Sequence, residues 1–556
     1  MAATFLTTDQ TTSVAVDDSD TVTLLPGVFL TTQGAAFTSA STDLDDARVN
    51  VLGTVATGAD GIDFDTSVGS VTSTRVNIGG QGAIFAQGFG IVFGEGSENR
   101  IQNLGTISAT SSAVFLRDQT GAQIENHGVI QSEFGSAIET LAGSGPTTIF
   151  NAGTLSGLGA EPSGGGDVAA AVNGEDLLLQ NTGLIVGRGG VALNFLGTVG
   201  QLTNSGVVQG AVVSASGTQL KILNSGEISG PVTFGDMADT YDGRGGGHVV
   251  GTVSGGTGAD TLIGGTLEDR FDGDEGDDRL LGLDGADTLD GGLGEDEILG
   301  GGGDDLIDGG ANDDEILGGS GDDLIDGGSG ADMIRGESGD DTIEGGSASD
   351  TIDGGSGEEN INAGSSGDLV FGRGGADFIR GDSGSDTIEG GAGADTISGG
   401  TAFDVIDGGS GDDRIFGGAN EDTLRGSTGD DSLFGGSGDD SLRGGSGEDT
   451  LSGDAGQDTL SGGAGADVFV FDAVSDSAQG GTTRDLILDF EAGTDRIDLS
   501  ALGDLTFVAE YTGAAGEVRY NGNIGRLYVD IDGDRASDFA VDLAGDPALT
   551  EDDLIL

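Results

Sequence analysis

The residues with the clearest potential for chemistry are acidic side chains that recur at every ninth position. From Asp260 to Asp467 this period runs without a slip and gives 24 repeats, since (467 − 260)/9 + 1 = 24. The recurring residue is Asp in every repeat except the one that carries Glu359. Carboxylates are hard oxygen donors, so a long series of them at fixed spacing predicts a series of sites for a hard cation such as calcium.

The residues around each carboxylate form the frame Gly-Gly-x-Gly-x-Asp-x-apolar-x, which is complete at residues 255–263. The acidic residue takes the sixth place and an apolar residue always takes the eighth. Places seven to nine predict a short strand with one inward side chain, and the glycine-rich places before them predict a turn that points carbonyls at an ion. Two repeats close one coil, so carboxylates two repeats apart become neighbours about 4.8 Å from each other.

This pattern resembles the RTX family of nonapeptide repeats, which wind into a parallel β-roll with calcium in the turns. The resemblance covers all 24 repeats and implies that sixth-place carboxylates and glycine carbonyls bind many calcium ions. The metal ligands that it implies are Asp260, Asp278, Asp287, Asp296, Asp305, Asp314, Asp323, Asp332, Asp341, Asp350, Asp377, Asp386, Asp395, Asp413, Asp422, Asp431, Asp440, Asp449, Asp458 and Asp467. Such a roll is expected to be unfolded without calcium, because metal binding then supplies the free energy of folding.

Six repeats depart from the frame at the fourth place. Glycine is replaced there by Leu267, Asn312, Ala348, Ser366, Ala402 and Asn420. Asparagine tolerates the left-handed conformation, so the sites at Asn312 and Asn420 are expected to persist. Leu267, Ala348 and Ala402 argue against occupied sites beside them. The irregular repeat around Ser366 is expected to be a kink or a vacant site.

The first 230 residues carry a different repeat, in which Asn-x-Gly is flanked by aliphatic residues. It occurs at Asn77, Asn103, Asn126, Asn151, Asn181, Asn204 and Asn224, with a looser start at Asn50. These irregular intervals exclude a helical-hairpin array, whose period is rigid. They favour a parallel β-helix, in which loops of variable length project from a constant three-strand coil. The asparagines are then expected to stack in an internal ladder of amide hydrogen bonds. The pattern resembles the coils of autotransporter and haemagglutinin-like adhesin passengers.

The segment after Asp467 resembles the C-terminal capping and secretion region of serralysin-type proteases and other substrates of bacterial type I secretion. Residues 468–472, 484–490, 493–500 and 551–556 carry this resemblance. It implies export by the type I machinery of a Gram-negative bacterium, to the cell surface or the extracellular space. Within this segment, residues 530–538 match the first part of an EF-hand loop, but Val541 stands where the final Glu belongs, which favours a plain acidic hairpin turn.

The predicted fold is an all-β solenoid with three parts. An N-terminal parallel β-helix, residues 1–234, continues into a calcium-bound parallel β-roll, residues 235–470. A C-terminal β-rich cap with the type I secretion region follows, residues 471–556. No proline lies between Pro231 and Pro547, as unbroken strand stacking requires, because proline removes a ladder donor.

Composition excludes several classes of partner. The net charge is −76 and Lys221 is the only lysine, which excludes nucleic acid and anionic membranes, since both attract Lys and Arg. Cysteine is absent, so disulfides and thiolate sites are excluded. No stretch approaches about 18 apolar residues, so no transmembrane segment is expected.

Two function classes remain open. The favoured class is a secreted structural or adhesive protein that folds on calcium outside the cell: a surface layer, an extracellular matrix component or an adhesin. Its expected partners are copies of itself and, as a candidate, a cell-surface polysaccharide. The alternative is an extracellular polysaccharide-active enzyme, a lyase or epimerase that carries an RTX secretion module.

The enzyme alternative lacks the residues that it requires. The chain has two histidines, His127 and His248, and no His-Glu-x-x-His motif, so a zinc protease is excluded. A sugar-active site needs a base and an electrophile clustered on one face, yet no tyrosine and six cations precede residue 240. Of these cations, Arg75 and Arg100 are spaced about one coil apart and are expected to be exposed strand-edge charges. The sequence therefore favours a protein without catalytic residues.

Overall fold

The computed structural model describes residues 3–40, 43–65, 69–141, 145–157, 170–477, 484–545 and 547–556. These residues form β-strands almost throughout, and the helices among them are two three-residue 3-10 turns, Ser500–Leu502 and Glu551–Asp553. Neither of these turns has the length or apolar character to cross a membrane. The predicted all-β class is confirmed. The chain divides into two compact units, Met1–Leu293 and Gly294–Leu556.

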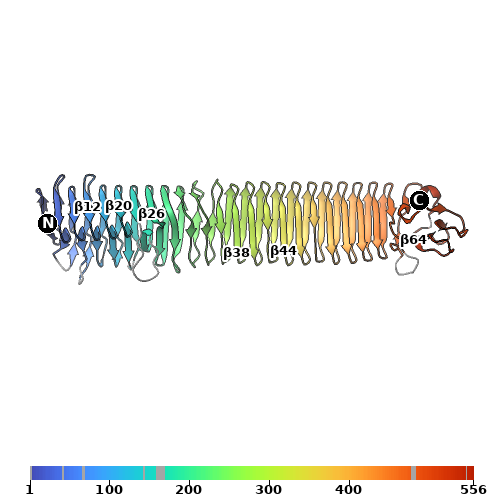
Figure 1. The fold of residues 1–556 in the computed structure, drawn as a ribbon, viewed down its shortest axis with the longest axis horizontal. Helices are drawn as coiled ribbons and strands as arrows, with labels where there is room; N and C mark the ends of the chain where they lie inside the picture. Colours follow the sequence, from blue (N-terminus) through green and yellow to red (C-terminus); the bar gives the residue numbers. More distant parts are fainter. Residues whose placement is uncertain are drawn as a thin grey trace. The chain divides into compact units, whose positions relative to one another are not determined.

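The first unit is a parallel β-solenoid whose coils stack strand on strand (Figure 1). One coil runs through β11 (Arg75–Ile78), β12 (Ala83–Ala86) and β13 (Ile91–Phe93), and a short β14 (Gly96–Ser97) precedes β15 (Arg100–Asn103) of the next coil. β11 pairs with β15, and β12 with β16 (Thr106–Ala109), both in parallel. The predicted three-strand coil is therefore present, with an additional two-residue strand.

One sheet of this unit runs along all of its coils. Its strands in order are β1 (Ala3–Leu6), β3 (Thr21–Leu24), β7 (Arg48–Val51), β11, β15, β19 (Gln123–Asn126), β22 (Thr147–Asn151), β25 (Leu177–Asn181), β27 (Val199–Asn204), β29 (Gln219–Asn224), β32 (Thr240–Asp242), β35 (Thr261–Ile263) and β37 (Arg279–Asp284). Buried aliphatic side chains such as Ile101, Ile124 and Ile149 align across it and form one column of the core. The roll repeats at β35 and β37 thus continue the register of the β-helix.

The predicted asparagine ladder lies inside the first unit. Its members are Asn103, Asn126, Asn151, Asn181, Asn204 and Asn224, all between 0% and 2% exposed. The Nδ2 of each donates to the Oδ1 of the next, over 2.8 to 2.9 Å. The last amide, that of Asn224, donates to the hydroxyl of Tyr241 over 3.1 Å. A column of buried primary amides can satisfy its own hydrogen bonds in this way, because each amide carries both a donor and an acceptor.

From Asn103 onward, the glycine of each Asn-x-Gly is required by the close approach of neighbouring coils. A Cβ on Gly128 would lie 2.1 Å from the carbonyl oxygen of Gly105, and a Cβ on Gly153 would lie 2.1 Å from that of Gly128. No side chain can be accommodated at that separation from a backbone atom. The backbone N–H of Gly128 also donates to the Oδ1 of Asn126 over 3.2 Å, so the tripeptide forms one hydrogen-bonded turn.

The expectation for Asn77 and Asn50 was wrong. Asn77 pairs in register with Gln102, whereas Ile78 occupies the position that aligns with Asn103. Asn77 is half-buried on the outer face of the sheet, where its Nδ2 donates to the Oδ1 of Asn50 over 2.8 Å. The internal ladder therefore begins at Asn103, one coil after Asn77 and two coils after Asn50, because a shift of one residue moves a side chain to the other face of a strand.

The second unit contains a β-roll in which each coil is made of two nonapeptides (Figure 1). Residues two repeats apart pair in parallel, as in Ile298 with Ile316 and Ile307 with Ile325. Most strands span six residues, as in β39 (Glu297–Gly302) and β41 (Glu315–Ser320), and so extend through places seven to nine into places one to three of the next repeat. The predicted tripeptide strand is therefore too short, and the turn is confined to places four to six.

A cap closes the C-terminal side of the second unit. β59 (Leu486–Ile487) and β60 (Arg496–Asp498) continue the two sheets of the roll. β62 (Glu517–Asn521), β63 (Arg526–Asp530) and β64 (Phe539–Leu543) form an antiparallel sheet that joins β59 through β64. β65 (Leu554–Ile555) pairs with β60. The predicted β-rich cap is confirmed.

Replacing Asn151 by Ala is expected to lower the free energy of unfolding by about 1–3 kcal/mol, because the amides of Asn126 and Asn181 each lose a buried partner. Urea denaturation in the presence of calcium measures this change. Asn77→Ala is the matched control: it also removes an amide-to-amide bond, but a half-buried one that water replaces, so a change within about 0.5 kcal/mol is expected. Equal effects of the two substitutions would contradict a stabilising internal ladder.

Candidate metal centre

The sixth-place carboxylates of the second unit form two columns of buried side chains. One column holds Asp296, Asp314, Asp332, Asp350, Asp368, Asp386, Asp404, Asp422, Asp440 and Asp458; the other holds Asp305, Asp323, Asp341, Glu359, Asp377, Asp395, Asp413, Asp431, Asp449 and Asp467. All of them are between 0% and 3% exposed. In the first unit, Asp260, Asp269, Asp278 and Asp287 are between 2% and 5% exposed. Aspartate is almost never buried in this way without a partner.

One hydrogen bond is repeated along each column. The backbone N–H of one sixth-place residue donates to the Oδ1 of the carboxylate one coil further on. It measures 2.9 Å from Asp332 to Asp350 and 3.0 Å from Asp395 to Asp413. Each of these carboxylates therefore uses one oxygen to join two coils.

The second carboxylate oxygen, Oδ2, is buried and has no hydrogen-bond partner in the described part of the chain at most of these positions. This holds for Asp260, Asp314, Asp323, Asp332, Asp341, Asp350, Asp368, Asp377, Asp386, Asp395, Asp404, Asp413, Asp422, Asp431, Asp440, Asp449 and Asp458. A buried charged oxygen without a partner is strongly unfavourable. The arrangement therefore requires either a proton or a cation at each of these oxygens.

The first place of every repeat except that of Asp368, which carries Ala363, is a glycine, and this glycine leaves room beside the oxygen. A Cβ on Gly390 would lie 2.5 Å from the Oδ2 of Asp395 and 2.6 Å from the carbonyl oxygen of Gly408 in the next coil. A Cβ on Gly327 would likewise lie 2.8 Å from the Oδ2 of Asp332 and 2.6 Å from the carbonyl oxygen of Gly345. Carboxylate and carbonyl oxygens thus converge on a space that any side chain would fill. This donor set fits calcium, which binds carboxylate and backbone oxygens.

Burial also changes the protonation of the columns. Desolvation raises the pKa of Asp314 to about 8, that of Asp323 and Asp413 to about 7, and that of Asp332 to about 6, with neighbouring carboxylates adding to the increase. Desolvation likewise raises the pKa of Glu359, whose carboxyl group lies against Asp377. Without a cation, the columns therefore hold protons at a pH where exposed carboxylates are charged.

Three further carboxylates take part in the same hydrogen bond between coils but lie outside the run of nine-residue repeats. Asp239, Asp485 and Asp495 are between 0% and 4% exposed. Of these, Asp485 has an unpartnered Oδ2 among the described residues, whereas the Oδ2 atoms of Asp239 and Asp495 accept the N–H groups of Gly235 and Glu491. The N–H of Asp239 donates to Asp260, and the N–H groups of Asp458 and Asp467 donate to Asp485 and Asp495, over 2.6, 2.9 and 3.1 Å. Each is followed two residues later by a buried Tyr241, Ile487 or Ile497. The motif Asp-x-apolar, without the period, is the sequence signal that finds them.

The repeats that depart from the frame at the fourth place differ among themselves. Asn312, Ala348, Ser366, Ala402 and Asn420 all adopt a positive φ, between 82° and 93°, so the left-handed turn persists even with Ala or Ser. Leu267 is not among the residues with a positive φ, and the Oδ2 of Asp269 beside it accepts the N–H of Gly265 over 2.8 Å. The repeat of Leu267 is therefore built differently from those of Ala348 and Ala402.

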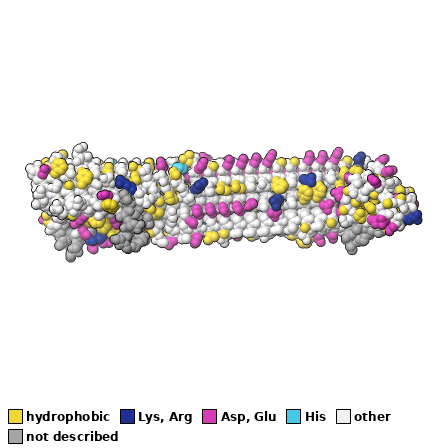
Figure 2. Space-filling view, in the orientation of Figure 1, with side chains coloured by type: hydrophobic (Ala, Val, Ile, Leu, Met, Phe, Trp, Pro, Cys, Tyr) yellow, Lys and Arg dark blue, Asp and Glu magenta, His cyan; other side chains and the backbone are white. Residues whose placement is uncertain are grey.

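A second acidic series lies at the fifth place and faces solvent. The N–H of Asp322 donates to the Oδ1 of Asp304, and the N–H of Asp340 donates to that of Asp322, over 3.0 and 2.9 Å. The bonds run in the opposite direction to those of the buried columns. Figure 2 shows acidic side chains in regular rows on the surface. These exposed carboxylates keep their solvation, which distinguishes them from the sixth-place residues.

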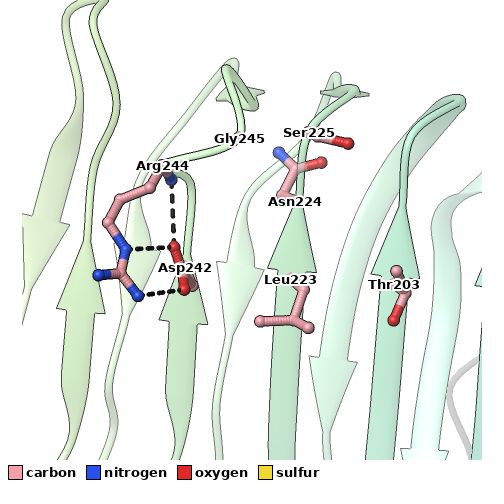
Figure 3. Close-up of a pocket in the computed structure, with 7 residues that line it drawn as sticks. All are labelled: Thr203, Leu223, Asn224, Ser225, Asp242, Arg244 and Gly245. Atoms are coloured by element: carbon pink, nitrogen blue, oxygen red, sulfur yellow. Dashed lines mark hydrogen bonds and ion pairs between the residues drawn. The ribbon is translucent and has the colours of Figure 1, made fainter.

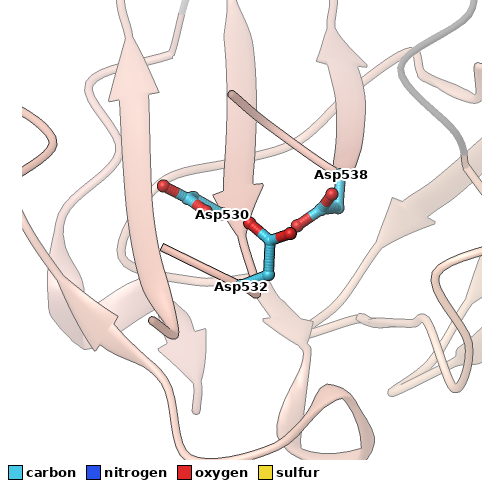
Figure 4. A group of neighbouring side chains, drawn as sticks. All are labelled: Asp530, Asp532 and Asp538. Carbon is cyan, nitrogen blue, oxygen red and sulfur yellow. The ribbon is translucent and has the colours of Figure 1, made fainter. Parts of the chain in front are cut away.

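An isolated acidic cluster occurs in the hairpin between β63 and β64. Oxygen atoms of Asp530, Asp532 and Asp538 lie within 4.8 Å of one another (Figure 4). The two oxygens of Asp530 accept the N–H groups of Gly533 and Arg535 over 2.8 and 2.9 Å, and Asp538 accepts the N–H of Ile531 over 2.8 Å. The strands on either side are antiparallel, as the hairpin interpretation predicts. These carboxylates hold the turn through backbone donors.

The same part of the chain matches known proteins. The family described as Peptidase M10 serralysin C terminal matches residues 245–556. Serralysin A of Dickeya chrysanthemi is 38% identical over 75 residues, and Metalloprotease AprA of Pseudomonas entomophila is 40% identical over 78 residues. Each match covers 12% of this chain and 16% of the relative, so the chain spans only a small part of the length of these proteins.

Two solved structures are also similar over part of the chain. They are solution structures of the AlgE6R3 and AlgE6R2 subunits of the Azotobacter vinelandii mannuronan C5-epimerase, with identities of 35% and 33%. They cover 26% and 27% of this chain and 78% and 90% of their own chains. The TM-scores are 0.15 and 0.16.

In chelator, the roll is expected to fold as the pH falls from about 8 to about 5 and to unfold as the pH rises again. Unfolded carboxyls have a pKa of about 4, whereas burial raises the pKa of Asp314 and Asp323 to about 8 and about 7. The folded state therefore binds more protons in this interval, and its stability is lost as pH rises through the folded pKa values. Circular dichroism against pH measures the transition; calcium-loaded protein, as the control, should stay folded throughout. A roll that is equally folded in chelator at pH 8 would contradict the assignment.

Proposed function

Because the chain belongs, through residues 245–556, to the family of serralysin C-terminal regions, we propose that it is a secreted structural or adhesive protein that folds on calcium outside the cell. Its place is the cell surface or extracellular matrix of a Gram-negative bacterium, as a surface layer, matrix fibre or adhesin. The observation that carries the proposal is the pair of buried carboxylate columns with unpartnered oxygens, which makes the fold conditional on a cation.

The residues that would hold calcium are the sixth-place aspartates together with glycine carbonyls at the first place. Asp332 and Gly345, and Asp395 and Gly408, supply such oxygens from adjacent coils. When bound, calcium supplies positive charge between coils and so offsets the mutual repulsion of the carboxylates. The aspartates contribute in two ways, since Oδ1 joins the coils by a hydrogen bond and Oδ2 offers a ligand.

Magnitudes indicate that burial of apolar side chains cannot sustain the roll alone. Each repeat buries one aliphatic side chain, such as Ile334 or Ile343, which contributes about 2 kcal/mol. Two ionised carboxylates about 4.8 Å apart repel by about 3.5 kcal/mol at an effective dielectric constant of 20. An ionised roll without a cation is therefore expected to be unfolded.

Folding that depends on calcium suits export by a type I system. The folded chain places Leu554 in β65, where it pairs with Ile497, and the Asp553 side chain accepts the N–H of Gly493 over 2.7 Å. Residues 551–556 are thus part of the folded cap, and their buried members, Asp553 and Leu554, are accessible to the export machinery only while the cap is unfolded. A chain that stays unfolded at the low calcium of the cytoplasm keeps this signal exposed until export.

Deleting residues 551–556, or the larger segment 473–556, is expected to trap the protein inside the cell, because either deletion removes residues that resemble the secretion signal. Immunodetection in cell and medium fractions measures the distribution. Removal of residues 3–20, which lie far from the signal in the sequence, is the control and should leave export intact. Normal secretion of the chain without residues 473–556 would refute the type I assignment.

Purified protein is expected to form fibres, sheets or other ordered assemblies in millimolar calcium and to lose them, together with its roll, in chelator. Electron microscopy and circular dichroism report the two properties. Asp332→Ala combined with Asp350→Ala should reduce both, because these residues are consecutive in one buried column. The matched control is Asp322→Ala with Asp340→Ala, which removes the same charge from exposed positions.

Monodisperse folded protein under all calcium conditions would count against a self-assembling structural role. Turnover of an acidic polysaccharide by the purified chain would favour the alternative of a polysaccharide-active enzyme. Identical calcium dependence of the two double variants would contradict the assignment of calcium to the buried columns.

A further inference from the structure

The few basic residues of the β-helix gather on one face. Residues 1–250 contain seven cations in an acidic chain, and Arg48, Arg75, Arg100 and Lys221 all lie on strands of one sheet: β7, β11, β15 and β29. Arg244 follows β32 of the same sheet. Because these side chains alternate with the buried core positions of their strands, they project from the outer face.

Three of the arginines form a ladder. Arg48 pairs in register with Arg75, and Arg75 with Arg100. Like charges on adjacent strands oppose one another. Arg48 lies 3.9 Å from a carboxylate oxygen of Asp46, and Arg100 lies 3.1 Å from one of Glu125. The central Arg75 has no carboxylate within ion-pair distance among the described residues. The ladder therefore has positive charge available for an external anion.

Neutral polar side chains continue this face toward Lys221. Along the next strands the outward positions include Thr148, Gln180, Gln201 and Thr203. In the described part of the chain, none of these four side chains makes a hydrogen bond. They line a shallow groove of about 280 Å³ over β22, β25 and β27. Amide and hydroxyl groups that lack protein partners offer donors and acceptors to a ligand.

A second groove of about 300 Å³ adjoins the first, since Thr203 lines both. At its far side Arg244 lies against Asp242, with Nη2 and Nε at 2.8 and 3.0 Å from the two carboxylate oxygens (Figure 3). Lys221 lies beside the first groove, in register with Gln201, and has no ion-pair partner in the described structure. A polar track thus connects two regions of positive charge on the same sheet.

We propose that this face binds an acidic polysaccharide, a chain of carboxylated or sulfated sugars that crosses the strands from the arginine ladder toward Lys221. Adjacent strands are about 4.8 Å apart, which is close to the length of one sugar residue in an extended chain. Successive anionic groups then meet Arg48, Arg75 and Arg100, while sugar hydroxyls meet Gln180, Gln201 and Thr203. Arginine pairs with carboxylate and sulfate oxygens in a bidentate fashion.

The chemistry favours a polysaccharide over a nucleic acid. Single-stranded nucleic acid is bound by positive grooves together with several aromatic side chains on which bases stack. On the strands from β7 to β29, the outward positions of this face carry one aromatic residue among the described ones, Phe150, whose ring already packs against His127 at 5.8 Å. Hydroxyl and amide groups predominate instead. This inference names the partner of the proposed adhesive function. Binding of the sugar can be tested by itself, and only its biological role rests on the proposed function.

The test is binding of oligogalacturonate and of dextran sulfate to the full chain in millimolar calcium, measured by calorimetry. Arg75→Gln combined with Arg100→Gln should weaken binding about tenfold or more and flatten its dependence on salt, because charge-assisted hydrogen bonds are lost. Arg117→Gln with Arg188→Gln is the matched control, since these residues lie on β17 (Val114–Arg117) and β26 (Leu184–Leu196) of the other sheet. The control should bind within about twofold of the parent. The two ligands distinguish carboxylate from sulfate as the preferred anion.

Three outcomes would overturn the proposal: equal affinity of the ladder variant and the parent, equal binding of neutral dextran, or tighter binding of single-stranded DNA than of both acidic sugars. If the sugar instead adheres to the acidic roll through calcium bridges, the ladder variant and the parent should bind it equally, which is the first of these outcomes. Circular dichroism in calcium verifies that each variant is folded. Calcium-dependent assembly without sugar binding would refute this inference alone, whereas sugar binding without assembly would refute the structural role alone.

Discussion

The structure of the roll depends on how a buried carboxylate is shared between two coils. Oδ1 of a residue such as Asp350 accepts the N–H of Asp332 in the preceding coil, while Oδ2 remains without a protein donor. The hydrogen bond sets the register of the coils, and the remaining oxygen creates a demand for positive charge. The hydrogen bond that stacks the coils and the oxygen that lacks a partner therefore belong to the same carboxylate.

The asparagine ladder of the first unit also joins successive coils through buried polar side chains, but these side chains are neutral. An amide carries a donor and an acceptor, so Asn126 accepts from Asn103 and donates to Asn151. A carboxylate only accepts, so a column of them cannot satisfy itself. Tyr241 receives the last amide of the ladder, and Asp239, two residues earlier, already accepts and donates in the manner of the roll. One coil later, Asp260 is the first of these carboxylates whose Oδ2 has no hydrogen-bond partner among the described residues.

The roll and the β-helix also differ in the charges that they carry. The roll carries its carboxylates both in the buried columns and in exposed rows such as Asp304, Asp322 and Asp340. The β-helix instead places Arg48, Arg75 and Arg100 on one outer face, beside amides and hydroxyls. The same stacking of coils therefore arranges two kinds of charge: buried carboxylates in the roll and exposed cations on the β-helix.

Much of this fold follows from the sequence because the contacts join residues at fixed separations. Ile298 and Ile316 lie two repeats apart, so a local period encodes a non-local pairing. The same reasoning predicted the all-β class, the buried aliphatic columns and the internal asparagines from Asn103 to Asn224. Loops of unequal length break this correspondence, and for that reason Asn77 was placed on the wrong face and Asp485 and Asp495 were not found. The spacing of Arg75 and Arg100 by about one coil is visible in the sequence. Only the tertiary structure decided the exact register that aligns both of them with Arg48, and the grooves beside Thr203, because the loops between these strands have unequal lengths.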